Sequence, residues 1–292
     1  MREAGPHTPK RRAKQLTALG LLLAAPATGL DCRSGEGAVI VEETNGSFVC
    51  RPDATGPFPG VLYNHGGLGL AVGGDLEGTC RALAGAGYLA SVPLREDPPG
   101  KNILAHQQEV LDALDALHGM LEVDPARIGV MGFSRGGMLS LGAALQRAGV
   151  VGATVLMAPA PGNGYLLQLL QDVSAISAPM LIQVAANDDV AADHVFYAQQ
   201  VADALQAESK TYTHSVLDPY PFPGCTGCNG HDVFQGVDDE FTDYWCEVRT
   251  FLAPLLDGVA RVPGMSGQAQ LWAAVLLSVA GVLALRGRVT RK

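Results

Sequence analysis

The chain has 292 residues, of which 48% are hydrophobic and 17% are charged, so it is long enough and apolar enough for one large globular core. The formal net charge is -9, and the sequence between the two termini has no basic patch. These values argue against nucleic acid as a partner, because phosphate binding calls for clustered cations.

The first 27 residues have the layout of a secretory signal peptide. Four cations between residues 10 and 14 precede the apolar stretch "LTALGLLLAAPA", which ends in a small-x-small cleavage sequence. The alternative is a short basic amphipathic helix, but the apolar run lacks polar residues at helical spacing. We therefore expect residues 1–27 to be removed and the protein to be exported to the periplasm or cell envelope.

A hairpin follows, with the sequence "VIVEETNGSFVC" over residues 39–50 and an Asn45-Gly46 turn. The chain has six cysteines, an even number that suits an oxidising compartment. Cys32 and Cys50 flank the hairpin and could pair, but the sequence does not choose among the possible disulfides.

Strand and helix patterns alternate after the hairpin. The β-branched apolar runs predict buried strands at 60–64, 88–93, 127–132, 153–158 and 180–185, and the periodic segments predict helices at 75–86, 103–122, 135–148, 193–207 and 239–256. This alternation predicts one α/β domain over residues 28–260, a mostly parallel sheet with helices on both faces. About twenty residues, 159–178, separate two of the strands and leave room for little or no lid.

The candidate nucleophile is Ser134, in "GVMGFSRGG" at the end of the 127–132 strand and just before the 135–148 helix. The pentapeptide G-x-S-x-G in this strand-to-helix setting is typical of a nucleophile elbow, whose strained turn exposes the hydroxyl. A plain glycine-rich turn is the alternative. A serine hydroxyl needs a base to accept its proton.

The base and its acid should follow the nucleophile in the order serine, acid, histidine. Asp188 comes directly after a strand, with Asp189 as a near-equal rival, and His231 lies in the loop before the last helix. The other candidate histidines fit less well. We expect surface or helix-end positions for His106 and His118, a packed position in a strand for His214, and a loop-stabilising role for His65.

An oxyanion hole needs two backbone N–H donors. One candidate is Arg135, the residue after the nucleophile, and the other is Gly67 in "HGGLG", where glycines allow a close approach of the backbone.

A hypothesis that competes with the role of His231 as a base makes Cys225, Cys228 and His231 ligands of a zinc ion. No fourth ligand is evident, and an exported chain favours a disulfide between the two cysteines.

Residues 261–292 predict a C-terminal tail outside the domain. The run "LWAAVLLSVAGVLAL" is followed by "RGRVTRK", which is typical of a short membrane span with a basic end, and a buried core helix is the alternative. The segment resembles the sorting tails of bacterial envelope proteins. It therefore predicts attachment to the membrane unless the tail is cut off after export.

Together, "NHGG", "VDPARIGVMGFSRGG", "QVAANDD" and "GHDVF" resemble the dienelactone hydrolase branch of the α/β-hydrolase superfamily over about residues 38–257. The resemblance implies an α/β-hydrolase fold, the catalytic residues Ser134, Asp188 and His231, and no metal or organic cofactor. Dienelactone hydrolases proper use a cysteine nucleophile, so the serine favours a general carboxylesterase over lactone ring opening of dienelactone. The short 159–178 segment favours small or accessible esters. A peptidase or amidase, and a non-catalytic envelope binding protein, are the alternatives. The oligomeric state stays open.

Overall fold

The computed structural model describes residues 37–67, 74–95, 102–189, 192–237 and 244–257, all in the unit Cys32–Lys292. The expected signal peptide, the C-terminal tail and the limits of the domain at residues 28 and 260 lie outside the described residues. Within the described ranges, no helix combines the length and the hydropathy needed to cross a membrane.

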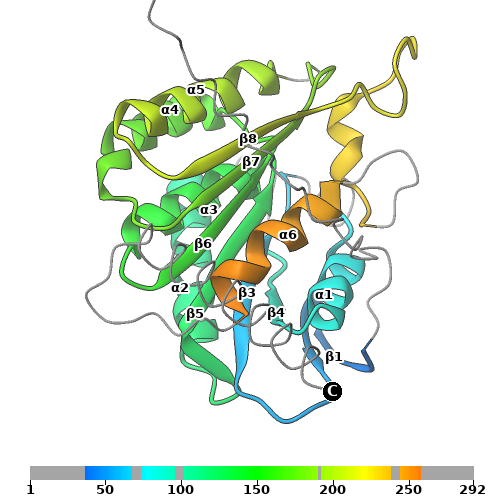
Figure 1. The fold of residues 1–292 in the computed structure, drawn as a ribbon, viewed down its shortest axis with the longest axis vertical. Coiled ribbons are helices and arrows are strands. Elements are labelled where there is room, and N and C mark those ends of the chain that lie inside the picture. Colours follow the sequence, from blue (N-terminus) through cyan, green and yellow to red (C-terminus); the bar gives the residue numbers. More distant parts are fainter. Residues whose placement is uncertain (1–36, 68–73, 96–101, 190–191, 238–243, 258–292) are drawn as a thin grey trace, which may run out of the picture. The chain divides into compact units, whose positions relative to one another are not determined.

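Eight strands of the described residues form one sheet, with the spatial order β1-β2-β4-β3-β5-β6-β7-β8 (Figure 1). The β1–β2 and β2–β4 pairs are antiparallel, and all pairs from β4 to β8 are parallel. The mostly parallel sheet is therefore confirmed. The strands are β1 Val39–Thr44, β2 Ser47–Pro52, β3 Phe58–Asn64, β4 Leu89–Val92, β5 Val123–Phe133, β6 Val151–Met157, β7 Met180–Ala185 and β8 Tyr212–Leu217.

Helices cover both faces of the sheet, as a parallel sheet requires. Helices α1 and α6 lie on one face, and α2 and α3 lie on the other (Figure 1). The helices are α1 Leu76–Gly85, α2 Ile103–His118, α3 Arg135–Gln146, α4 Tyr165–Leu169, α5 His194–Ala207 and α6 Tyr244–Leu256, with short 3-10 turns η1 Gly162–Gly164, η2 Leu170–Ala175 and η3 Gly230–Phe234.

Local signals in the sequence begin and end these elements. The side chains of Asp75, Asn102 and Asp193 each accept a hydrogen bond from a backbone N–H in the first turn of α1, α2 and α5, which satisfies donors that have no partner inside the helix. The predicted hairpin is confirmed, because β1 and β2 meet at an Asn45-Gly46 turn in which both residues have positive φ.

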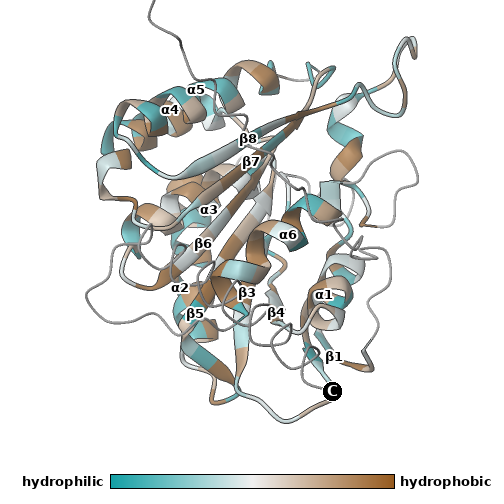
Figure 2. Ribbon diagram, in the orientation of Figure 1, coloured by the Kyte–Doolittle hydropathy of each residue, from teal (hydrophilic) through white to brown (hydrophobic). Residues whose placement is uncertain are grey.

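Hydrophobic residues gather along the central strands (Figure 2). Every residue of β3, β4, β6 and β7 is buried, which is the pattern of strands covered on both faces. The core is continuous with the buried sides of the helices. This rigid platform fixes the positions of the loops that follow the strands.

Two boundaries differ from the sequence prediction. The expected 103–122 helix ends at His118, where Gly119 caps it, and β5 begins at Val123, four residues before the expected start. The added strand residues pair with the start of β3, and the register then shifts at Gly60. Between β6 and β7 the chain forms only η1, the five-residue α4 and η2, so the expected short cover is confirmed.

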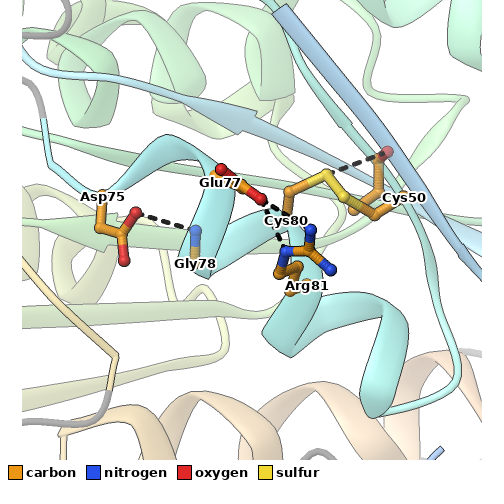
Figure 3. Close-up of a disulfide and its surroundings, with 7 residues drawn as sticks. Cys50, Asp75, Glu77, Gly78, Cys80 and Arg81 are labelled. Carbon is orange, nitrogen blue, oxygen red and sulfur yellow. Dashed lines mark hydrogen bonds and ion pairs between the residues drawn. A yellow bond between two sulfur atoms is a disulfide. The ribbon is translucent and has the colours of Figure 1, made fainter. Parts of the chain in front are cut away.

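A disulfide joins Cys50 of β2 to Cys80 of α1 (Figure 3). The pairing of Cys32 with Cys50 is therefore wrong: α1 packs over β2 and brings Cys80 within a Cα–Cα distance of 5.5 Å. A second disulfide joins Cys225 to Cys228, and no described cysteine is free. The first turns of α1 are further stabilised by the Asp75 cap and by a Glu77–Arg81 ion pair (Figure 3).

Candidate active site

Ser134 lies in a strained turn between β5 and α3. Its φ of 54° and ψ of -117° place a non-glycine residue in a backbone conformation that L-residues rarely adopt. Hydrogen bonds hold the turn, from Ser134 N–H to the carbonyl of Met157 at 2.8 Å and from Ala160 N–H to the carbonyl of Ser134 at 3.0 Å. The side chain is half-buried. This geometry is that of a nucleophile elbow.

Two glycines make the elbow possible because backbone segments touch there. A Cβ on Gly136 would lie 1.9 Å from the carbonyl oxygen of Asn64 and 2.5 Å from that of His65, and one on Gly132 would lie 2.4 Å from the carbonyl oxygen of Gly136. Neither position has room for a side chain. The first turn of α3 therefore packs directly against the end of β3, where the candidate oxyanion loop begins.

The structure brings Asp188 and His231 together although they lie 43 residues apart. The two carboxylate oxygens of Asp188 are 2.9 and 3.0 Å from Nδ1 of His231. Asp188 is fully buried, whereas the neighbouring Asp189 is exposed, so the geometry selects Asp188 between the two sequence candidates. A carboxylate only accepts hydrogen bonds, so Nδ1 of His231 carries the proton and Nε2 is left as the basic atom.

The loops that carry this pair are joined to each other. The Asn187 side chain donates to the carbonyl of Tyr220 and accepts from its N–H, both at 2.9 Å. Asn229 caps the turn that begins η3 by accepting from His231 N–H at 3.0 Å. A Cβ on Gly230 would lie 2.6–2.7 Å from atoms of Asn187 and Asp188. The loop of His231 can therefore lie this close to the loop of Asp188 only because residue 230 is glycine.

His231 also lies beside the elbow. Its ring centroid is 4.5 Å from that of Phe133, the residue before Ser134, and 17% of its side chain is exposed. Among the described residues, Ser134 Oγ and His231 form no hydrogen bond. In unliganded enzymes the contact between nucleophile and base is often long and tightens only with substrate. The catalytic roles of the three residues stay predictions that this geometry supports.

The two residues that carry the candidate oxyanion donors, Gly67 and Arg135, lie close together. Arg135 is the first residue of α3, so its backbone N–H belongs to the first-turn donors of the helix. A Cβ on Gly67 would lie 3.5 Å from Cζ and Nε of Arg135. Gly67 therefore lies beside the Arg135 side chain.

His65 stabilises the backbone that leads to Gly67. Its Nε2 accepts the N–H of Arg95 at 3.0 Å, so its Nδ1 carries the proton that it donates to the carbonyl of Gly66 at 2.6 Å. The Arg95 guanidinium also donates to the carbonyls of His65 and Gly66. Burial, and after it the Arg95 charge, lower the pKa of His65 to about 3. These contacts match the loop-stabilising role expected for His65.

His194, which the sequence analysis did not consider, is the third titratable group of the cluster. It begins α5, is 3% exposed, and its ring centroid is 4.2 Å from that of His231. Asp188, His194 and His231 each have a ligand atom within 4.8 Å of the others. Asp188 and His231 bond to each other, and the His194 ring lies against that of His231 with 33° between the ring planes. We therefore describe these groups as a candidate acid–base pair and its neighbour.

The remaining histidines lie outside this cluster. His118 ends α2 and His214 is half-buried in β8, both as expected. His106 is 1% exposed, so the expected surface position is wrong: it lies on the face of α2 that packs against the domain. The zinc hypothesis for the 225–231 loop is also wrong, because the disulfide between Cys225 and Cys228 leaves no thiolate to bind a metal.

Comparisons with known proteins agree with this fold. Residues 99–221 match the model of the dienelactone hydrolase family, a range that includes Ser134 and Asp188 and stops before His231. The mitochondrial acyl-coenzyme A thioesterase 2 of Mus musculus is 25% identical over 68% of this chain. The alignment covers 56% of that protein, so the chain spans little more than half of its length.

Two solved structures share the fold. A Klebsiella pneumoniae protein provisionally described as a dienelactone hydrolase is 20% identical, with a TM-score of 0.55, over 74% of this chain and 99% of that one. The acylaminoacyl peptidase of Pyrococcus horikoshii is 15% identical, with a TM-score of 0.58, over 81% of this chain and 44% of that one.

The sheet, the flanking helices and the elbow define the α/β-hydrolase fold. More particularly, residues 99–221 match the dienelactone hydrolase family.

Proposed function

We propose that the protein is an exported serine hydrolase that cleaves carboxylic esters through an acyl-enzyme on Ser134. The observation that carries the proposal is the buried Asp188 carboxylate on Nδ1 of His231, which leaves Nε2 as a base beside the elbow. Serine, acid and base follow each other in the order that α/β hydrolases use.

The reaction follows from these positions. Nε2 of His231 takes the proton of Ser134 Oγ while Oγ bonds to the ester carbonyl carbon, and the N–H groups of Arg135 and Gly67 bind the oxyanion. The oxyanion collapses, the bond to the leaving alkoxide breaks, and that oxygen takes the proton from His231. Water then repeats the sequence on the acyl-enzyme and releases the carboxylic acid. Asp188 stabilises His231 while it is charged.

The short η1, α4 and η2 segment supports ester substrates that are small or accessible. Among the described residues, only these short elements lie in the chain between β6 and β7, so we expect little apolar cover there for an extended acyl chain. The thioesterase relative is consistent with acyl transfer from a good leaving group. A serine nucleophile in place of cysteine favours a general esterase over dienelactone itself.

A fluorophosphonate probe tests the nucleophile directly. We expect it to label the full-length wild-type chain once, and not the Ser134→Ala variant. A wild type that resists the probe would favour the alternative of a non-catalytic binding protein.

A substrate panel tests which bond is cleaved. Untreated wild type is assayed on p-nitrophenyl esters, acyl thioesters and p-nitroanilides of matched acyl groups. Faster cleavage of the anilides would favour the peptidase or amidase alternative, which the peptidase-like fold keeps open.

Export is the second part of the proposal. The N-terminal pattern of residues 1–27 and the absence of free cysteines among the described residues both support an oxidising compartment. The apolar segment 271–285 supports attachment to the membrane until the tail is removed. The mass of the mature protein tests both ends, because an intact mass equal to the full 292 residues would contradict processing at either end.

A further inference from the structure

The first turn of α5 packs against the proposed base. His194 lies only a few residues after Asp188, and its ring centroid is 4.2 Å from that of His231, with 33° between the ring planes. Phe133 contacts the same imidazole at 4.5 Å from β5. Aromatic ring contacts at such distances restrict the rotation of the imidazole and stabilise its position beyond what the burial of apolar area contributes.

Contacts with the backbone of Asp188 and of Pro159 hold His194 in place. Its backbone N–H donates to the carbonyl of Asp188 at 3.1 Å, and its Nδ1 lies 3.4 Å from the carbonyl of Pro159, which follows β6. Only 3% of the residue is exposed. Because a carbonyl only accepts, Nδ1 is the donor in the Pro159 contact. Two backbone carbonyls and burial therefore hold the His194 ring against His231.

The charges around this pair set its electrostatics. Among the described residues, the titratable groups in contact with the His231 ring are Asp188 and His194, while β5 contributes the uncharged ring of Phe133. Burial lowers the pKa of His194, Asp188 opposes this shift and His231 adds to it. A neutral ring next to an imidazolium attracts the cation through its π face, whereas a second charged ring would repel it.

We propose that His194 is a positioning residue for His231: its neutral ring keeps Nδ1 of His231 directed at Asp188 and stabilises the imidazolium that forms during the reaction. This role rests on the proposed function, because it needs His231 as the base. What His194 supplies is an aromatic face, so another aromatic ring should replace it and an aliphatic side chain of similar bulk should not.

The test compares His194→Phe with His194→Leu in the full-length chain. Both variants keep a large buried side chain, and only Phe keeps the ring. We expect His194→Leu to lower kcat about three- to tenfold, the size of an aromatic contact, with KM unchanged. The acid limb of kcat/KM should move to lower pH, by about one unit for a tenfold effect, because the cation is less stable. His194→Phe should keep kcat and the acid limb near wild type.

A spectroscopic measurement separates this inference from the proposed activity. The low-field proton resonance of the His231–Asp188 hydrogen bond can be recorded without substrate. We expect it in the wild type and in His194→Phe, and we expect it broadened by exchange in His194→Leu. If the fluorophosphonate probe does not label the wild type but this resonance still depends on the ring, the esterase proposal fails, and only the orientation of His231 by the His194 ring stands.

His214→Leu is the matched control, since it removes a half-buried histidine ring from β8, outside the cluster. It should change neither kcat nor the resonance, and thermal unfolding checks that each variant is folded. The proposal is overturned if His194→Leu behaves as wild type, or if the Phe and Leu variants are equally impaired. Stoichiometric Co²⁺ binding that is lost in His194→Phe would also overturn it, because His194 would then be a metal ligand.

Discussion

Replacing Asp188 by asparagine tests the acid–base pair most directly. The substitution keeps the shape of the side chain and removes the charge that faces the imidazolium of His231. The nearest oxygen is 2.9 Å from Nδ1. At an effective dielectric constant of about 20, unit charges about 3–4 Å apart attract each other by about 4–6 kcal/mol, which corresponds to roughly a 10³–10⁴-fold loss in kcat.

The expected loss of about 4–6 kcal/mol applies at this position because Asp188 is fully buried, so water cannot stabilise the imidazolium in place of the lost charge. In the Asp188→Asn variant, the new amide can also present its NH₂ group to Nδ1 of His231, which would move the proton of the imidazole to the wrong nitrogen. The assay is steady-state hydrolysis of a p-nitrophenyl ester, with rates expressed per mole of folded chain.

Asp189→Asn is the matched control. It makes the same chemical change at the adjacent, exposed carboxylate, and its kcat should stay within about twofold of wild type, as expected for an exposed charge. A kcat for Asp188→Asn within about tenfold of wild type would contradict the assigned role of the buried charge. The same holds if the two variants lose activity equally, since the burial that distinguishes the two aspartates would then have no consequence.

Three further predictions concern the framework around the site. Replacing both Cys50 and Cys80 by alanine should lower the free energy of unfolding by about 3–4 kcal/mol, measured in urea, because the disulfide spans 30 residues; a change below about 1 kcal/mol would contradict this. The free energy of unfolding should fall by at most about 1.4 kcal/mol per pH unit as the pH drops from 6.5 toward 3. The reason is that His65 takes up a proton in the unfolded chain over this range, whereas in the folded chain it stays neutral. The His65→Gln variant should show a flatter pH dependence over that range, and an equal slope would count against the assignment. Gly230→Ala should lower kcat strongly and the melting temperature only slightly, because its Cβ would push the His231 loop away from the Asp188 loop. A wild-type kcat in the folded variant would rule this out.

The fold and the elbow could be predicted from sequence because their signals are local. Apolar runs fully buried on both faces read as strands, and the Asn45-Gly46 turn fixes its hairpin within two residues. Ser134 was recognisable since the glycines that allow its turn are its own neighbours. The boundary of β5 was not, because the pairing of Val123 with β3 depends on a register shift between distant segments.

The rest of the site depends on contacts between distant parts of the chain. Two adjacent aspartates look alike in sequence, and only burial separates Asp188 from Asp189. Cys80 reaches Cys50 because α1 packs over β2, which no spacing reveals. His194 carries no local signal except its position at the start of the helix after the acid loop, and its meaning comes from the ring it touches.

The contact between Gly136 and the end of β3 limits how the pocket can be redesigned. Because backbone meets backbone there, saturation mutagenesis at Gly132 or Gly136 should return almost exclusively the parental residue. New substrate preferences must instead be sought in side chains of the 161–178 and 221–228 segments, which follow the strands and make none of the hydrogen bonds described above for the elbow or for the Asp188 and His231 loops. An engineer can therefore treat the catalytic turn as a fixed part and these two segments as the adjustable ones.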